Sequence, residues 1–229
     1  MKSQRNAGLI IAIIILILWS LSIFFLMRWD TDLKNWKTYA MIFVQMHLYT
    51  GLFITAHDAM HGTVTSIKNL NNFIGQTCTL LYALFPFQKL NSKHHLHHRH
   101  VHTPDDPDHY NGNFISWYYK FIAEYISWWQ IVLMAVIYNV LKLWINELNL
   151  IMFWVVPSLL STLQLFYFGT WQPHHGHHTN KHQSRTQSEN HLKAFFSCYF
   201  FGYHFEHHDS PGTPWWKLWK LKSSGTIKI

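Results

Sequence analysis

Charged residues and cysteines are scarce in this sequence of 229 residues. Only 13% of the residues are charged, roughly half the share found in soluble domains. The two cysteines, Cys78 and Cys198, lie in apolar stretches without a partner at metal-ligand spacing. This argues against a disulfide framework and against a cysteine-based zinc site, so we expect both thiols to be small buried hydrophobes.

Nucleotide and haem motifs are also lacking. The scattered glycines form no G-x-G-x-x-G fingerprint, so any redox chemistry would need electrons from a separate donor. The formal charge is +7, but the basic residues are scattered between long apolar segments. We therefore favour attraction to an anionic membrane leaflet and expect no nucleic acid partner.

Apolar, aromatic and histidine residues are abundant instead. Hydrophobic residues make up 49% of the chain, and there are twelve tryptophans and nineteen histidines. Tryptophan collects at membrane interfaces, and histidine is the commonest metal ligand among side chains. The composition thus predicts an integral membrane protein that binds metal.

Long apolar runs define the expected spans. Leu9–Met27 is broken only by Ser20 and Ser22, and it is long enough to cross a hydrocarbon core of about 30 Å. The alternative is a signal peptide, but the following Arg28 and its neighbours offer no small-residue cleavage site. The four expected spans are Leu9–Met27, Tyr39–Thr55, Phe121–Trp144 and Leu148–Phe168.

One further apolar segment, Leu70–Leu90, is interrupted by polar residues, glycine and Pro86, which favours a re-entrant hairpin over a clean span. We also expect a bend at Pro157 and an antiparallel pairing of the last two spans. The predicted fold is a single all-α integral membrane domain over residues 1–229. It has about four transmembrane helices plus the hairpin, and a cytoplasmic, histidine-rich cap.

The orientation follows from the positions of lysine and arginine. If the N-terminus is cytoplasmic, Arg28, Lys34, Lys37 and Lys142 lie outside, and most of the other basic residues face the cytoplasm. With four spans and one hairpin, every histidine cluster then falls on the same cytoplasmic side. The topology rests on hydropathy alone, yet it gathers the candidate ligands together.

Three histidine clusters have the spacing of metal ligands. One is an H-x(3)-H pair, and two share the spacing H-x-x-H-H, which places each set on one helical face. A pair at this spacing is often incidental, and a solvated basic patch would explain one cluster but not the repeated set. Eight or more imidazoles match two ions at four to five ligands each, and imidazole suits zinc, copper, iron and nickel alike. The clusters are His57 and His61; His94, His97 and His98; and His204, His207 and His208.

These boxes resemble those of the membrane fatty acid desaturase/hydroxylase superfamily. The sequence H-D-A-M-H-G from His57 and the sequence F-G-Y-H-x-E-H-H from Phe201 resemble the β-carotene ketolases more narrowly. The similarity includes D-P-D from Asp106, F-G-T from Phe168 with the following Pro173-His174, and P-W-W-K-L in the tail. It runs from about residue 40 to residue 220.

The resemblance implies a non-haem di-iron centre that uses O2. It carries over the eight box histidines as iron ligands, with His174 as a ninth. The run His174–His178 holds several histidines, so which of them is the ninth ligand stays open. Four carboxylates are candidates for holding the ligands in place, with ordinary charge balance as the alternative: Asp58, Asp106, Asp108 and Glu206.

The remaining histidines receive weaker assignments. We expect a solvated or supporting role for His95, His100 and His102, because they lie off the shared face of their box. His47, His109 and His191 are isolated, which favours a structural role. His182 lies in a stretch similar to the family, and its role is open.

The resemblance also implies the substrate and the partners. The substrate would be a carotenoid that enters from the membrane lipid, with an external electron donor that is ferredoxin-like or another reductase. Two successive hydroxylations at C4 of a β-ionone ring would give a geminal diol, which loses water to become the ketone of echinenone or canthaxanthin. Several aromatic side chains could line the entry, although bilayer anchoring is favoured for each: Trp128, Trp129, Trp144, Trp154 and Phe166. The tail residues Trp215, Trp216, Lys217, Trp219 and Lys220 indicate an interfacial segment.

Three alternatives remain at this stage. The nearest is a carotenoid ring hydroxylase or a fatty acyl desaturase/hydroxylase of the same superfamily. A His-rich membrane metal transporter would need ionisable ligands deep inside the spans, where only His47 and Glu124 approach such positions. A structural membrane protein with a basic tail would not explain the repeated ligand spacing.

Overall fold

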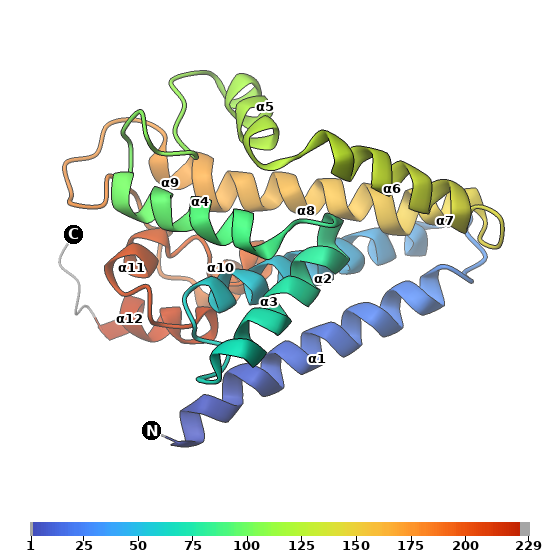
Figure 1. Cartoon of the computed structure of the whole chain (residues 1–229), viewed down its shortest axis with the longest axis horizontal. Coiled ribbons are helices and arrows are strands. Elements are labelled where there is room, and N and C mark those ends of the chain that lie inside the picture. Colours follow the sequence, from blue (N-terminus) through green and yellow to red (C-terminus); the bar gives the residue numbers. More distant parts are fainter. Residues whose placement is uncertain (1, 225–229) are drawn as a thin grey trace.

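The computed structural model describes residues 2–224, and every regular element in that range is a helix (Figure 1). The helices are α1 (Lys2–Leu26), α2 (Trp36–Met60), α3 (Lys68–Ala83), α4 (Phe87–His100), α5 (Phe114–Tyr125), α6 (Trp128–Leu141), α7 (Glu147–Leu150), α8 (Val156–Phe166), α9 (Gln172–His174), α10 (His191–Cys198), α11 (His204–Asp209) and α12 (Leu218–Ser224). Two π-helical turns, Ile151–Val155 and Tyr167–Trp171, join α7 to α8 and α8 to α9, and a 3₁₀ turn, Trp215–Lys217, precedes α12. The expectation of an all-α chain is confirmed for the described residues.

Three helices are long and apolar enough to cross a membrane. They are Ala7–Leu26, Trp36–Met60 and the continuous helix Glu147–His174. Only 22% of the first span is buried within the protein, and its outer face carries large exposed side chains such as Ile17 and Phe25. Because water would not stabilise such a surface, the helices fit a membrane protein.

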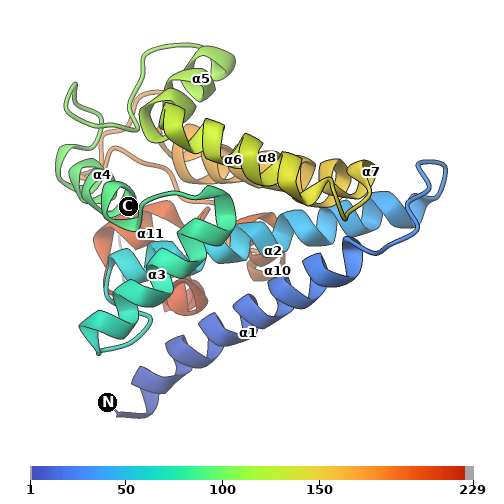
Figure 2. The same cartoon turned by 45° about the vertical axis from the view of Figure 1, so that its right-hand side comes forward.

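Helix α2 is the centre of the bundle. It packs against α3, α8 and α1 (Figure 2), and most of the residues in its second half are buried. Polar side chains join these helices where they meet. Thr50 on α2 lies 2.8 Å from Ser161 on α8, and Tyr82 on α3 lies 3.2 Å from the same hydroxyl. Hydrogen bonds of this kind stabilise helix pairs in lipid, where apolar contact alone gives little preference.

The predicted span Phe121–Trp144 is not a single continuous helix. The chain breaks between α5 and α6, which meet at 85°, so the pair is at most one broken span (Figure 2). Ser127 directly precedes α6, has an extended backbone and forms a capping box with Gln130. The Lys89 ammonium then binds the Tyr125 carbonyl at 2.6 Å and the Ser127 hydroxyl at 2.9 Å. These contacts satisfy the polar groups at the break, which hydropathy does not register.

The segment Leu70–Leu90 does turn back on itself, but its return limb is longer than predicted. The turn after α3 lies at Leu84, which has a left-handed backbone with φ of 57°, and α4 then continues to His100. This longer helix carries the second histidine box. Whether the hairpin dips into lipid stays a prediction.

The last span is longer and more continuous than the predicted Leu148–Phe168. It runs from Glu147 to His174 without a sharp bend at Pro157. The π-helical turn Ile151–Val155 ends two residues before this proline, which lies in the first turn of α8, where a missing N–H donor is tolerated. As a result, His174 stands at the end of the same rigid helix.

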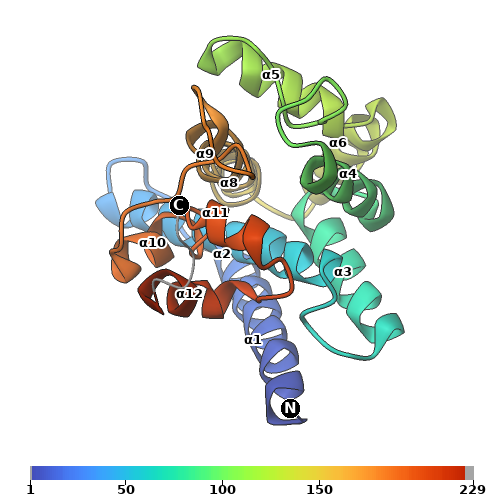
Figure 3. The same ribbon diagram turned by 90° about the vertical axis from the view of Figure 1, so that its left-hand side faces the viewer.

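The elements that carry the histidine boxes meet at one end of the bundle. Seen from that end, α4, α9 and α11 surround the end of α2 (Figure 3). The connections from α1 to α2 and from α6 to α7 lie at the opposite end (Figure 1). The predicted gathering of the boxes on one side is therefore present, while its cytoplasmic orientation stays a prediction.

Candidate metal centre

Each histidine box is built on a short helical segment. His57 lies in the last turn of α2, and His61 is the residue that ends this helix, with its N–H bonded to the Asp58 carbonyl. Since these positions are four residues apart, both imidazoles extend from one side of the helix end. The two H-x-x-H-H boxes lie on α4 and α11 and repeat the same arrangement.

Eight of the nine predicted ligands form two compact groups. Within each group, one nitrogen from every ring lies within 4.8 Å of the others. The first group joins α2, α4 and α11, and the second joins α4, α9 and α11. The groups are His57, His61, His94 and His207, and His97, His174, His204 and His208.

The ninth histidine, His98, lies beside the first group. Its Nε2 is 3.1 Å from that of His94 and 3.0 Å from that of His207. Its ring also stacks on His208 of the second group, with centroids 4.1 Å apart. His98 thus completes a set of five rings on one side and touches the set of four on the other.

The separations between ring nitrogens fit metal ligation. Nitrogens bound to one ion at about 2.1 Å and at right angles lie about 3 Å apart. In the first group, His61 Nε2 and His94 Nε2 are 2.7 Å apart. In the second, the Nε2 atom of His204 lies 2.9 Å from those of His174 and His208. The donors of each group therefore converge on one point.

The burial of the rings and their unpaired nitrogens also indicate a metal site. Burial and the neighbouring imidazoles hold the pKa of His204, His207 and His208 well below the ordinary value, so these rings stay neutral, which is the form that binds metal. Both ring nitrogens of His57 are buried without a hydrogen bond partner among the described residues. A bound ion would satisfy such an atom, and the nine-imidazole set is consistent with a non-haem iron centre.

Asp106 is the carboxylate that holds a ring of the centre directly. His97 Nδ1 donates to Asp106 Oδ1 at 2.9 Å, and the backbone N–H of Asp108 donates to the same oxygen. The backbone N–H of His102 donates to Asp106 Oδ2. Burial lowers the pKa of His97, but the charges of Asp108 and Asp106 outweigh this and raise the pKa above its ordinary value. The contact fixes the ring so that Nε2 faces the second group.

The other three carboxylates lie farther from the rings of the two groups. Asp58 lies 3.9 Å from His57 Nδ1 and accepts the Trp215 N–H at 3.2 Å. Asp108 accepts the hydroxyl of Tyr125 and lies 3.9 Å from His97 Nδ1.

Glu206 is the carboxylate that makes no contact with a ring. It is bound by Thr186 at 2.5 Å and by Lys222 at 3.2 Å. Because Glu206 belongs to α11, which carries the third box, these two contacts tie that helix to Thr186 and to the segment around Lys222.

Within the run His174–His178, His174 is the ring that belongs to the second group. Its Nδ1 donates to the Gln183 carbonyl at 3.0 Å, which leaves Nε2 for the centre, while His175 is exposed and stacks on Trp171. His102 supports the same helix end by donating to the His174 carbonyl at 2.8 Å.

The other histidines lie outside the two groups. His95 is exposed and donates to the Met60 carbonyl, and His182 lies 3.2 Å from Asp209. His191 contacts the hydroxyl of Tyr203, and His47 stacks on Tyr199 inside the bundle. His100 ends α4, and His109 lies beside His102. The two cysteines are buried and free, as expected.

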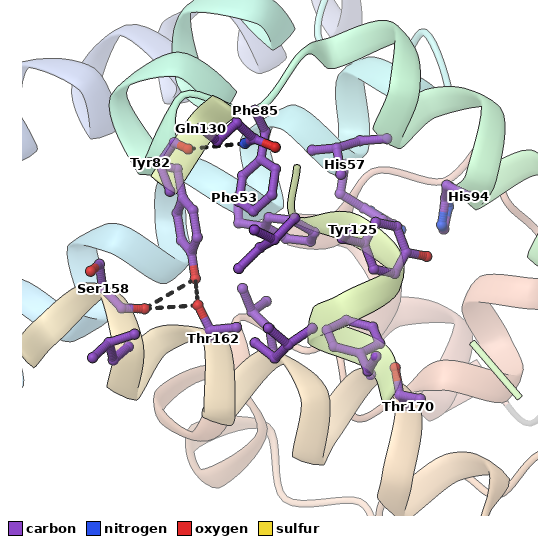
Figure 4. A pocket seen from close by; sticks show the side chains of 18 of the residues that line it. Phe53, His57, Tyr82, Phe85, His94, Tyr125, Gln130, Ser158, Thr162 and Thr170 are labelled. Atoms are coloured by element: carbon purple, nitrogen blue, oxygen red, sulfur yellow. Dashed lines mark hydrogen bonds between the residues drawn. The ribbon is translucent and has the colours of Figure 1, made fainter. Parts of the chain in front are cut away.

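An apolar cavity of about 470 Å³ leads to both groups of histidines (Figure 4). Four rings line its inner end: His57 and His94 come from the first group, and His97 and His204 from the second. Its walls are mainly apolar side chains of α2, α3, α5, α6 and α8, among them Phe53, Phe85, Met134, Trp154 and Leu165. A volume of this size is typical of small-molecule sites.

The far end of the cavity reaches the outer surface between α6 and α8. Ile131 and Leu159 line the cavity, yet they are 61% and 58% exposed. The cavity is therefore open at the outer surface of the bundle. Of the five aromatic residues considered from the sequence, only Trp154 lines the cavity. Trp128, Trp129 and Trp144 are exposed, and Phe166 is buried against Phe121, a residue of the cavity wall.

Several residues around the site were not found from the sequence. Tyr125 positions Asp108, the ion pair of Lys93 and Glu124 ties α4 to α5, and Thr170 lines the cavity. Only Thr170 had a usable signal, because it precedes His174 by four residues and so shares its helical face.

Comparison with known proteins supports this picture. The sequence model of the family described as "Fatty acid desaturase" matches residues 34–139 and 114–223. A β-carotene ketolase from Paracoccus sp. (strain N81106 / MBIC 01143) is 41% identical over 184 residues, which cover 78% of this chain and 76% of that protein. A zeaxanthin 4-ketolase from Chlamydomonas reinhardtii is 38% identical over an alignment of 237 positions, covering 94% of this chain and 53% of that protein.

A more distant relative is an omega-3 fatty acid desaturase from Caenorhabditis elegans. It is 38% identical over 60 residues, which cover 25% of this chain and 14% of that protein. No solved structure gives a significant match.

Proposed function

Because the chain belongs to the fatty acid desaturase family and, within it, to the β-carotene ketolases, we propose that it oxidises C4 of a β-ionone ring to a ketone. The observation that carries the proposal is the cavity, whose inner end is lined by rings from both histidine groups. An apolar substrate at that end would present a carbon atom to both metal positions together.

The nine histidines would hold two iron ions. His57, His61, His94, His98 and His207 would serve one ion, and His97, His174, His204 and His208 the other. The bound iron pair would supply the activation of O2 and the oxidising power needed to break a C–H bond. The protein's part is to hold the rings rigidly and to exclude water from the inner end of the cavity.

The cavity suits a carotenoid ring. Apolar walls bind a hydrocarbon without fixing it by polar contacts, and the opening between α6 and α8 lets the polyene extend toward the lipid. The C4 methylene is allylic, so its C–H bonds are weaker than those of a saturated chain.

Two rounds of oxidation at the same carbon would give the ketone. Each round consumes O2, two electrons and two protons, inserts one oxygen atom into a C–H bond and releases the other as water. The resulting geminal diol then loses water to form the ketone. The electrons come from an external donor, a ferredoxin-like protein or another reductase.

We further propose that the histidine end of the bundle faces the cytoplasm. Most lysine and arginine residues lie toward this end, in agreement with the positive-inside preference. The membrane lipid would deliver the carotenoid, and the electron donor would approach from the cytoplasm.

Expression in bacteria that accumulate β-carotene tests the function. We expect echinenone and canthaxanthin in the pigment extract, together with iron in the purified protein. Pigments without a keto group, from membranes that contain the inserted protein, would reject the proposal. Ring-hydroxylated carotenoids or altered acyl chains would instead identify a ring hydroxylase or an acyl-lipid enzyme.

A further inference from the structure

The hydroxyl of Thr170 has an unusual environment within the cavity wall. The residue is only 3% exposed, and its oxygen points into the cavity, on the side of His94 and Tyr125 (Figure 4). It makes no hydrogen bond with any residue in the part of the chain that the structure describes.

Other helical threonines behave differently. Thr50, Thr55, Thr77 and Thr162 each donate to the carbonyl four residues earlier, at 3.1, 2.8, 2.9 and 2.9 Å respectively. Thr170 lies in the π-helical turn Tyr167–Trp171, which is wider than an α-helical turn. In this turn the hydroxyl of Thr170 does not make the bond to the carbonyl four residues earlier that the other threonines make.

The position of Thr170 is fixed by close packing. A Cβ atom on the preceding residue, Gly169, would lie 2.1 Å from the ring of Phe201, so glycine allows the helix to lie directly against that ring. Thr170 also precedes His174 by four residues, about 6 Å along the same helical face. The free hydroxyl therefore lies about one turn from a ligand of the centre.

Apart from the imidazoles of the centre, the other hydroxyl and amide groups of the cavity wall are already paired. Tyr125 donates to Asp108, and Tyr82 and Thr162 lie 2.8 Å apart. Gln130 donates to the Ala83 carbonyl and accepts the Ser127 N–H. Among the hydroxyls of this wall in the described chain, Thr170 carries the one without a partner.

We propose that the Thr170 hydroxyl binds the C4 alcohol formed in the first oxidation and retains it for the second. This inference rests on the proposed function. The unreacted ring has no polar atom and leaves the hydroxyl unpaired, which is unfavourable in an apolar cavity. The alcohol can both donate to and accept from a threonine hydroxyl. The site thus binds the intermediate more tightly than the substrate.

Retention has a chemical consequence. The first round converts a C–H bond into C–OH, with one oxygen atom from O2 and two electrons from the external donor. If the alcohol stays bound, the second round acts on the remaining C4–H bond, and the geminal diol loses water to give the ketone. If it leaves first, the alcohol accumulates in the membrane.

The test compares Thr170→Val, which removes the hydroxyl at nearly constant shape, with Thr170→Ser, which keeps it. Both are expressed in bacteria that accumulate β-carotene, and the ratio of C4 alcohol to C4 ketone is measured by chromatography. We expect this ratio to rise about tenfold in Thr170→Val, equivalent to about 1.4 kcal/mol of lost retention, and to stay near that of the unmodified protein in Thr170→Ser.

Thr162→Val is the matched control. Thr162 lines the same cavity, but its hydroxyl already donates to the Ser158 carbonyl and contacts Tyr82, so its loss should not change the ratio. Iron content, measured on each purified variant, shows whether the centre is intact.

The outcomes separate the two proposals. An unchanged ratio in iron-loaded Thr170→Val, with ketone still formed, overturns the role of Thr170 and leaves the ketolase function standing. A ratio that rises equally in Thr162→Val also overturns it, because the effect would then be general loosening. If the unmodified protein forms no C4 product, the function fails and this inference fails with it.

Discussion

At the scale of single residues, the centre depends on the contact between His97 and Asp106. The ring donates Nδ1–H to the carboxylate at 2.9 Å, and both side chains are buried. The negative charge fixes which nitrogen carries the proton and makes the other a stronger donor to metal. No other carboxylate in the described chain lies within hydrogen-bond distance of a ligand ring of either group.

Removing this charge should weaken iron binding. We expect Asp106→Asn to lower iron affinity roughly 10- to 100-fold, because the amide keeps the shape but not the charge that His97 faces. The measurement is iron content after dialysis against graded chelator. Asp105→Asn is the control, since the neighbouring Asp105 is exposed and bonds to no ligand. Equal iron retention in both variants would contradict the assigned role of Asp106.

At the scale of elements, a C-terminal strap, residues 214–224, contacts the segments that carry the first and third boxes. Its Trp215 N–H bonds to Asp58 beside the first box, and its Lys222 binds Glu206 inside the third. Trp216 reaches α1, where a Cβ atom on Gly8 would come within 2.9 Å of its ring. The strap therefore joins the first span, the first box and the third box, a role that exceeds the interfacial one expected from its tryptophans and lysines.

Breaking the ion pair should loosen the third box. Lys222→Met leaves the Glu206 carboxylate buried without its cation, and losing one partner of a buried pair costs on the order of 3 kcal/mol. We expect a lower thermal midpoint in detergent, with partial recovery in the double variant Lys222→Met/Glu206→Gln. The exposed neighbour Lys220, changed to Met, serves as the control. A midpoint equal to that of the control would show that the pair contributes nothing.

At the scale of the whole molecule, the bundle has two distinct ends. The histidine boxes and the strap lie at one end, and the connection from α1 to α2 lies at the other (Figure 1). Lys34 in that connection and Lys181 near the boxes are both exposed. If the bundle spans the membrane as proposed, these two residues face opposite compartments.

Cysteine labelling can test this orientation. We expect Lys34→Cys to react with an impermeant maleimide in intact cells, and Lys181→Cys to react only after the membrane is opened. The native Cys78 and Cys198 are both fully buried and give little background. The reverse pattern would place the histidine end outside the cytoplasm.

The sequence alone determined the helical class and indicated a histidine-rich metal site. Ligand spacing is a local property, because residues four apart share a helical face in any fold, so the eight box histidines could be identified from their order along the chain. The apolar runs were equally local, and three of them appear as helices able to span a membrane. Similarity of motifs then indicated His174, which the structure brings within 2.9 Å of His204.

The tertiary structure decided everything that depends on which groups meet across the bundle. Of the four candidate carboxylates, only Asp106 bonds to a ring of the centre. The helix breaks at Ser127, whose hydroxyl bonds to Lys89 of another helix, and the Thr170 hydroxyl is unpaired at the inner end of a cavity. Such contacts join residues far apart in the chain, and hydropathy and spacing describe only neighbours. The division follows from the physics: helix periodicity is set by the local backbone, whereas polar pairing and cavity shape are set by packing.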